Sequence, residues 1–234
     1  MIDADKYQPT GDESVGYPQI CIRTNRTAKR TNMKPIIDKA VSIGKQYPWS
    51  EKYTIIKEVF KSLGSDFGGG GFGHAWIIHF NSPAPGDYIS YAFHEGYGFV
   101  KNSEHSNVND SAERKFHLQR CIKLNNNLIT PSLIEEKLIP KFIDESNILS
   151  KLMKLTDADL PNGVYTPITN CSWFAGNLWN EIMSLSYEQS IENDINIDEL
   201  ADKMGLPFIK NIRAIGDPGM LAESIKKGLN ILKR

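Results

Sequence analysis

The segment that begins at Asn170 constrains the fold more than any other part of the chain. Asn170 is a favourable N-cap residue, so a helix should begin at Cys171. The apolar residues that follow recur at helical spacing, which predicts one continuous apolar face on a long helix. That face comprises Cys171, Phe174, Ala175, Leu178, Ile182 and Leu185. An apolar face of this length must be buried, and we expect it to pack on a β-sheet.

Four other stretches are rich in β-branched and aromatic residues, which is typical of strands: 19–23, 74–80, 88–93 and 115–124. The connection at 81–87 is too short for a crossover helix, so the second and third strands should be antiparallel. Further helices are expected from Pro35, from Tyr53 to a stop at Gly64, from Pro131 to about Asp144 with a kink at Pro140, and as two or more short helices after Ile197.

These elements predict an α+β fold, in which helices flank a small antiparallel sheet. Residues 1–18 are polar and rich in turn formers, which indicates a loose arm before the first strand. We divide the chain into a main domain at 1–187 and a C-terminal helical appendage at 188–234 that packs on it. A chain of 234 residues is long enough to bury a core of its own.

Composition excludes several classes of protein. The chain is 40% hydrophobic and 24% charged, as a globular protein is, and its net charge of −1 gives no general attraction to nucleic acid or anionic membranes. No stretch approaches 18 apolar residues, so membrane insertion is not expected. A basic run and an acidic run should be solvated faces, and a partner could contact either: Arg23, Arg26, Lys29, Arg30 and Lys34; Glu188, Glu192, Asp194, Asp198, Glu199 and Asp202.

The three cysteines are too widely spaced for a disulfide framework or a paired zinc motif. We interpret Cys21 and Cys121 as core residues of strands and expect synthesis in a reducing compartment. The chain begins Met1-Ile2-Asp3, with neither the basic nor the apolar region of a signal peptide. If the protein acts outside the cell that makes it, another route must export it.

Gly68, Gly70 and Gly73 satisfy the G-x-G-x-x-G pattern of dinucleotide sites. The pattern follows a predicted helix and precedes a predicted strand, which is the reverse of the order that places a helix N-terminus at the pyrophosphate. No Gly-Lys-Ser/Thr follows it, so a phosphate-binding loop is also excluded. We therefore expect no cofactor, and a loop that either passes close to a substrate or is a plain linker.

Cys171 and His74 are the best candidates for chemistry. A thiol in the first turn of a helix has a lowered pKa and is a usable nucleophile, although Cys171 could equally be a small buried hydrophobe. His74 begins a strand directly after the glycines, whereas strand alternation directs His79 to the opposite face. His94 or Ser90 could orient the His74 ring. The histidines lack a close i, i+4 pair, so no metal site is expected, and the two remaining histidines, His105 and His117, are interpreted as structural or surface residues.

The Gly73-His74-Ala75-Trp76 strand, the Ser90-Tyr91-Ala92-Phe93 strand and the later Asn170-Cys171-x-x-Phe174 helix together resemble circularly permuted papain-like cysteine hydrolases of the NlpC superfamily. In that group the histidine strand precedes the cysteine helix. The resemblance implies that Cys171 is the nucleophile and His74 the general base. It also implies a third polar residue on the strand after the histidine strand, for which the chain offers Ser90, His94 or Glu95; we take His94.

The resemblance implies acyl transfer, and we expect hydrolysis of amide bonds in peptidoglycan stem peptides. The expected setting is an antibacterial effector, made in the bacterial cytoplasm and exported by a machine such as type VI secretion to a target-cell periplasm. Its partners would be the peptidoglycan peptide, an immunity protein and a component of the secretion apparatus. The alternatives are a lipid or small-molecule acyltransferase or thioesterase, and a non-catalytic binding module.

Nucleic-acid binding is disfavoured. The stretch 198–207 reads as the start of a helix-turn-helix, but the segment that should then meet DNA carries only Lys210 and Arg213 for phosphates.

Overall fold

The computed structural model describes residues 5–67, 73–105, 107–124, 128–185, 191–192, 194–196, 202–203 and 214–231. Its strands are β1 (Gln19–Thr24), β2 (Ala75–Phe80), β3 (Tyr88–His94), β4 (Gly98–Lys101), β5 (Leu118–Lys123), β6 (Asp194–Asn196) and β7 (Ala214–Gly216). Its helices are α1 (Met33–Gly44), the 3-10 helix η1 (Trp49–Glu51), α2 (Lys52–Phe67), α3 (Pro131–Leu133), the π-helical segment η2 (Ile134–Leu138), α4 (Ile139–Leu152), α5 (Cys171–Leu185) and α7 (Pro218–Ile231).

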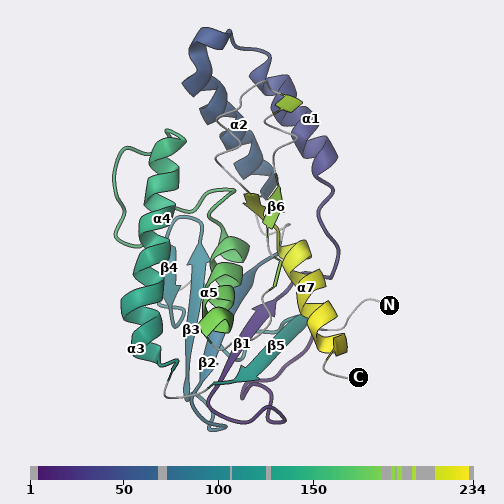
Figure 1. The fold of residues 1–234 in the computed structure, drawn as a ribbon, viewed down its shortest axis with the longest axis vertical. Coiled ribbons are helices and arrows are strands. Elements are labelled where there is room, and N and C mark those ends of the chain that lie inside the picture. The colour runs from purple at the N-terminus through teal and green to yellow at the C-terminus, as the bar shows by residue number, and fades with distance from the viewer. Residues whose placement is uncertain are drawn as a thin grey trace.

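The first five strands form one antiparallel sheet in the order β4-β3-β2-β1-β5. The predicted α+β class, with a small antiparallel sheet and flanking helices, is confirmed (Figure 1). β4 was not predicted, and it contributes one short edge to the sheet beside β3. The central strand β2 and its neighbour β1 are buried at every position, because both faces of the sheet are covered.

One face of the sheet, the helical face, is covered by α5, with α7 beside it (Figure 1). Its core joins side chains of α5 to Ile20, Ile22 and Ile77 of the central strands. The predicted apolar face of α5 is buried from Cys171 to Ile182, whereas Leu185 at the end of the helix is 41% exposed. The helix begins at Cys171 as predicted, and it packs on the sheet as predicted.

The opposite face, the loop face, is covered by irregular chain rather than by helices. Residues 107–117 and the N-terminal arm pack there, and a β-bridge between Lys6 and Phe116 joins the two segments. Val15 and Tyr17 of the arm rest on this core. The prediction of a loose arm is therefore wrong for residues 5–18, because the arm covers apolar strand side chains that would otherwise face water.

Two further predictions fail on the loop face. Cys21 and Cys121 are buried, as expected, but they form a disulfide, because β1 and β5 are neighbours despite a sequence separation of 100 residues. Arg23 is buried rather than solvated. Its guanidinium donates to Gln119 Oε1 at 2.6 Å and to the Ala112 carbonyl at 2.7 Å, and it lies 4.4 Å from the centre of the Phe116 ring. Burial lowers the pKa of Arg23 to about 9.

α1 and α2 pair as a helical hairpin that extends beyond one end of the sheet (Figure 1). α2 continues to Phe67, past the stop predicted at Gly64. The helix from Pro131 continues to Leu152 rather than ending near Asp144. The π-helical segment immediately before α4 accommodates Pro140, which lacks the N–H that an α-helical bond to residue 136 would need.

The C-terminal part contains the strand pair β6-β7 and α7, where the sequence predicted only short helices. Leu221, Ala222 and Ile225 of α7 belong to the same core as α5. Asp217 caps α7 and accepts hydrogen bonds from Thr31, which fixes the chain before α1 against this helix. Arg30 of the basic run pairs with Glu192 of the acidic run at 3.1 Å, so these two runs meet within the chain.

Two predicted motifs lie outside the described residues: the glycines at 68–72, and the 198–213 segment except for residues 202–203. Among the helices that are described, none is long and apolar enough to cross a membrane.

Candidate active site

Cys171 is the first residue of α5 and is 3% exposed. Asn170 Oδ1 accepts hydrogen bonds from the N–H groups of Ser172 and Trp173, both at 3.0 Å, which confirms the predicted N-cap. Asn170 Nδ2 donates to the carbonyl of Gly216 at 2.7 Å. The C-terminal segment therefore helps to hold the residue that precedes the thiol.

His74 precedes β2 and lies at the end of the sheet that faces the start of α5. Its backbone N–H donates to Asn25 Oδ1 at 2.6 Å, and its ring stacks on Trp76 with 5.7 Å between ring centres. The structure brings these two distant residues together: Cys171 Sγ lies 4.0 Å from the carbonyl oxygen of Gly73, the residue before His74, and each of the two side chains shifts the pKa of the other. The catalytic roles predicted for them stay predictions.

The charges of this pair stabilise one another. Burial would raise the pKa of Cys171, but the neighbouring His74, the Ala75 N–H and the Tyr165 hydroxyl together lower it. Burial would lower the pKa of His74, but attraction to Asp110 and to the Cys171 thiolate raises it to about 9. At neutral pH these shifts favour a thiolate and imidazolium, which is the reactive form of a cysteine nucleophile.

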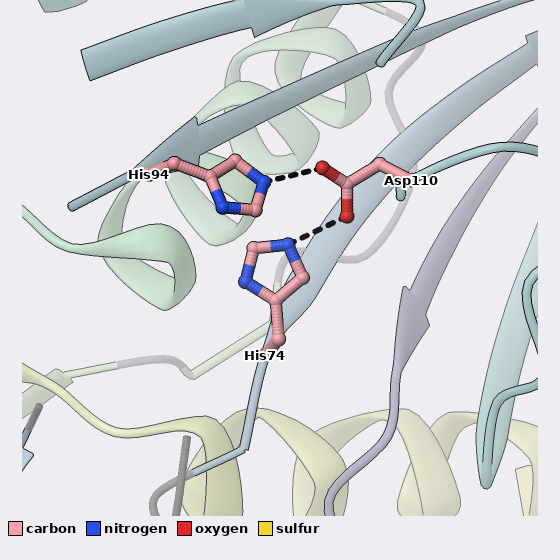
Figure 2. A group of neighbouring side chains, drawn as sticks. All are labelled: His74, His94 and Asp110. Atoms are coloured by element: carbon pink, nitrogen blue, oxygen red, sulfur yellow. Dashed lines mark hydrogen bonds and ion pairs between the residues drawn. The ribbon is translucent and has the colours of Figure 1, made fainter. Parts of the chain in front are cut away.

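Asp110 is the carboxylate that contacts the His74 ring, and no sequence pattern pointed to it. Asp110 Oδ1 lies 2.7 Å from His74 Nε2, and the carboxylate is 1% exposed (Figure 2). Arg114 Nη1 contacts the same oxygen at 2.8 Å, and Ser103 Oγ accepts the Asp110 N–H at 2.7 Å. Burial would raise the pKa of Asp110, but His74 and His94 lower it well below its usual range.

The three residues proposed from sequence as the third member have different positions. His94 Nε2 contacts Asp110 Oδ2, and its ring lies 4.5 Å from that of His74 between centres (Figure 2). Ser90 is buried, and its Oγ has no hydrogen-bond partner among the described residues. Glu95 is exposed just after β3. His94 therefore helps to hold the carboxylate that orients His74, and its own catalytic role stays a prediction.

The other histidines lie outside this cluster. His79 is buried on the helical face, and burial lowers its pKa, so the predicted separation from His74 is confirmed. His105 stacks on Tyr97, and His117 Nδ1 lies 3.5 Å from Asp5 Oδ1.

A pocket of about 330 Å³ is lined by two chain segments, 96–98 and 160–165. Cys171 is not part of its lining, but Tyr165 is, and the Tyr165 hydroxyl lies 3.9 Å from Cys171 Sγ. A Cβ on Gly98 would lie 2.2 Å from the Asn162 carbonyl oxygen, so this wall requires glycine. Burial and the Cys171 thiolate raise the pKa of Tyr165, which keeps its hydroxyl a donor.

One group of described side chains could hold a metal ion: the ligand atoms of His74, His94 and Asp110 all lie within 4.8 Å of one another. The absence of a helical i, i+4 histidine pair does not bear on this group, because its members come from two strand ends and a loop.

Comparisons of the chain with family models, with curated proteins and with solved structures found no match.

Proposed function

We propose that the protein is a cysteine hydrolase that cleaves amide bonds through a covalent thioester, with Cys171 as nucleophile, His74 as general base and acid, and Asp110 as the residue that orients His74. The observation that supports it is the pairing of a helix-start thiol with a histidine whose other nitrogen contacts a buried carboxylate. A merely structural cysteine needs neither the histidine nor the carboxylate.

The proposed chemistry has two steps. The Cys171 thiolate attacks the amide carbonyl, and the His74 imidazolium gives its Nδ1 proton to the departing amine. His74 then takes a proton from water, and the hydroxide hydrolyses the thioester and releases the thiol. Asp110 accepts the Nε2–H throughout and so holds the ring in one tautomer.

Two donors near the thiol suit the oxyanion that forms in each step. The N–H groups of Ser172 and Trp173 are already bonded to Asn170, whereas the N–H of Cys171 faces the Tyr165 hydroxyl oxygen. The Tyr165 hydroxyl is the second candidate donor, because it lies 3.9 Å from Sγ and stays protonated. Each such donor typically contributes about 10²–10³-fold to the rate.

For the substrate we propose peptidoglycan stem peptides, on the resemblance to permuted NlpC enzymes. The immunity protein, the secretion-apparatus partner and action in a target-cell periplasm stay predictions. A lipid or small-molecule acyl group is the second substrate class, and retention of a labelled acyl donor on Cys171 would favour it.

The thiol itself can be tested without knowing the substrate. In the absence of reductant Cys171 is the free thiol of the chain, because Cys21 and Cys121 are paired. We expect iodoacetamide to label Cys171 rapidly at pH 7, and His74→Ala to slow labelling to the rate of an ordinary thiol. His117→Ala is the matched control, because it also removes a histidine that faces a carboxylate. Equal labelling rates in wild type and His74→Ala would contradict the proposed ion pair.

The substrate is tested with purified peptidoglycan. We expect wild-type protein to release new amino termini, and Cys171→Ala to lose at least about 10⁴-fold of this activity, as removal of a nucleophile does in other acyl-transfer enzymes. Equal release by the two proteins would overturn the proposed mechanism. If wild-type protein directed to a periplasm is as harmless as Cys171→Ala, the antibacterial role is wrong.

A further inference from the structure

We propose that His74, His94 and Asp110 form a binding site for Zn²⁺, and that the bound ion prevents His74 from transferring protons in the proposed hydrolysis. The binding site stands on the geometry of the three side chains, whereas the blocking effect rests on the function proposed above.

The three side chains converge on one point from separate elements. His74 and His94 lie at adjacent ends of β2 and β3, and both direct Nε2 at the carboxylate of Asp110 (Figure 2). All three ligand atoms lie within 4.8 Å of one another, whereas two ligands on a zinc ion at about 2.0–2.2 Å are no more than about 4.4 Å apart. Small side-chain movements therefore bring all three to bonding distance.

The two carboxylate oxygens differ in a way that suits this arrangement. Oδ1 is shared between His74 and the Arg114 guanidinium, whereas Oδ2 contacts His94. Arg114 can keep Oδ1 while Oδ2 turns to a metal, and Ser103 continues to hold the Asp110 backbone. Outer contacts of this kind fix the orientation of a metal ligand.

The chemistry of the donors selects the ion. Two imidazole nitrogens and one carboxylate form a common three-ligand zinc set with an open fourth position. Ca²⁺ and Mg²⁺ prefer sites made of oxygen ligands and should bind poorly. The side chains of His74 and His94 are 13% and 19% exposed, so the two ligands lie at the edge of the core and not in its centre.

Zinc at this position would stop proton transfer by His74. Coordination replaces the proton on His74 Nε2, and the neutral ring then carries its remaining proton on Nδ1. Nδ1 is the nitrogen left to face Cys171 once Nε2 faces Asp110. Loss of that proton would leave an imidazolate on the ion, so the ring can neither protonate the departing amine nor take a proton from water.

Binding is tested by calorimetry with zinc chloride on the oxidised protein. We expect one ion per chain in wild type, and at least a tenfold weaker affinity in His94→Ala and in Asp110→Asn, because loss of an outer contact alone costs about 10–100-fold. Two variants give a result even if one of them folds poorly. His117→Ala is the matched control and should bind as wild type does. Equal zinc affinity in wild type and both cluster variants would overturn the site.

Two further measurements separate this inference from the proposed function. Zinc should slow the release of amino termini from peptidoglycan by wild type at least tenfold, and the zinc concentration needed for this inhibition should rise in His94→Ala by the factor found in calorimetry. Cys171→Ala should retain zinc binding, and loss of binding in that variant alone would show that the thiol, not the cluster, holds the ion. If Cys171 is unreactive with and without zinc, the proposed function fails while calorimetry still decides the site.

Discussion

The two faces of the sheet are covered in different ways, and the candidate site takes one residue from each cover. On the helical face, α5 is a regular helix whose first residue is Cys171. On the loop face, irregular chain between β4 and β5 carries Asp110. His74 lies at the end of the sheet where the two covers meet, and it contacts both residues. The proposed chemistry therefore depends on two separate covers of the sheet, a regular helix on one face and an irregular loop on the other.

The largest expected effect comes from removing the contribution of the loop face to the site. In Asp110→Asn, an amide replaces the carboxylate that accepts the His74 Nε2–H and offsets the imidazolium charge. We expect amide hydrolysis to fall about 10²–10⁴-fold, as when the orienting aspartate of a catalytic triad becomes asparagine. Asp87→Asn, in the loop before β3, is the matched control. An unchanged rate of hydrolysis in Asp110→Asn would show that His74 functions without the Asp110 carboxylate.

The second expected effect concerns the stability of the loop face alone. The Cys21–Cys121 disulfide lies under the loop that carries Asp110, and it closes a chain segment of 100 residues. We expect reduction to lower the free energy of unfolding by about 2–4 kcal/mol, because the reduced unfolded chain gains freedom. The measurement is urea denaturation with and without reductant, in a Cys171→Ala background so that no other thiol responds. Coincident unfolding curves of the oxidised and the reduced protein would contradict this prediction.

The sequence was most informative about the helical face. The apolar spacing from Cys171 to Ile182 and the N-cap Asn170 predicted where α5 begins and what it covers. A regular helix repeats its contacts every turn, so its buried face can be seen in a single sequence. The pairing of His74 with Cys171 was predicted from the place of each residue at the start of its element, and the family resemblance implies the same pair. The contact of Cys171 with Gly73 and the mutual pKa shifts agree with it.

The loop face was largely missed, for a physical reason. Arg23, Asp110 and the disulfide owe their positions to contacts with residues far along the chain, and irregular segments have no period that marks which side chains are buried. Asp110 in particular stands in a polar stretch that reads as an ordinary surface loop. Such a buried carboxylate can be identified once the positions of its two histidine partners in the folded chain are known.

The third expected effect is a pH dependence that links the two faces. In Cys171→Ala, we expect the pKa of His74 to stay above its unfolded value of 6.5, because the attraction to Asp110 remains when that to the thiolate is lost. Its contribution to stability is therefore complete below pH 6.5 and is lost as the pH rises through the folded-state pKa. We expect the free energy of unfolding to fall by about 1–2 kcal/mol between pH 6 and 9. The double variant Cys171→Ala with His74→Ala should lack this fall. A chelator is present throughout, so that bound metal does not contribute. If the free energy of unfolding depends on pH in the same way in both variants, His74 is not the group responsible.

The smallest expected effect tests how the helical face holds the thiol. Asn170→Ala removes the Oδ1 acceptor of two N–H groups and the Nδ2 donor to Gly216, so we expect about 1 kcal/mol less stability in urea denaturation. Asn170→Asp keeps the acceptor and loses the donor. Recovery in Asn170→Asp would assign the effect to the helix cap, whereas equal loss would assign it to the C-terminal segment. Both interpretations require that Asn170→Ala is less stable than wild type. An unchanged urea midpoint in Asn170→Ala would show that packing alone determines where α5 begins.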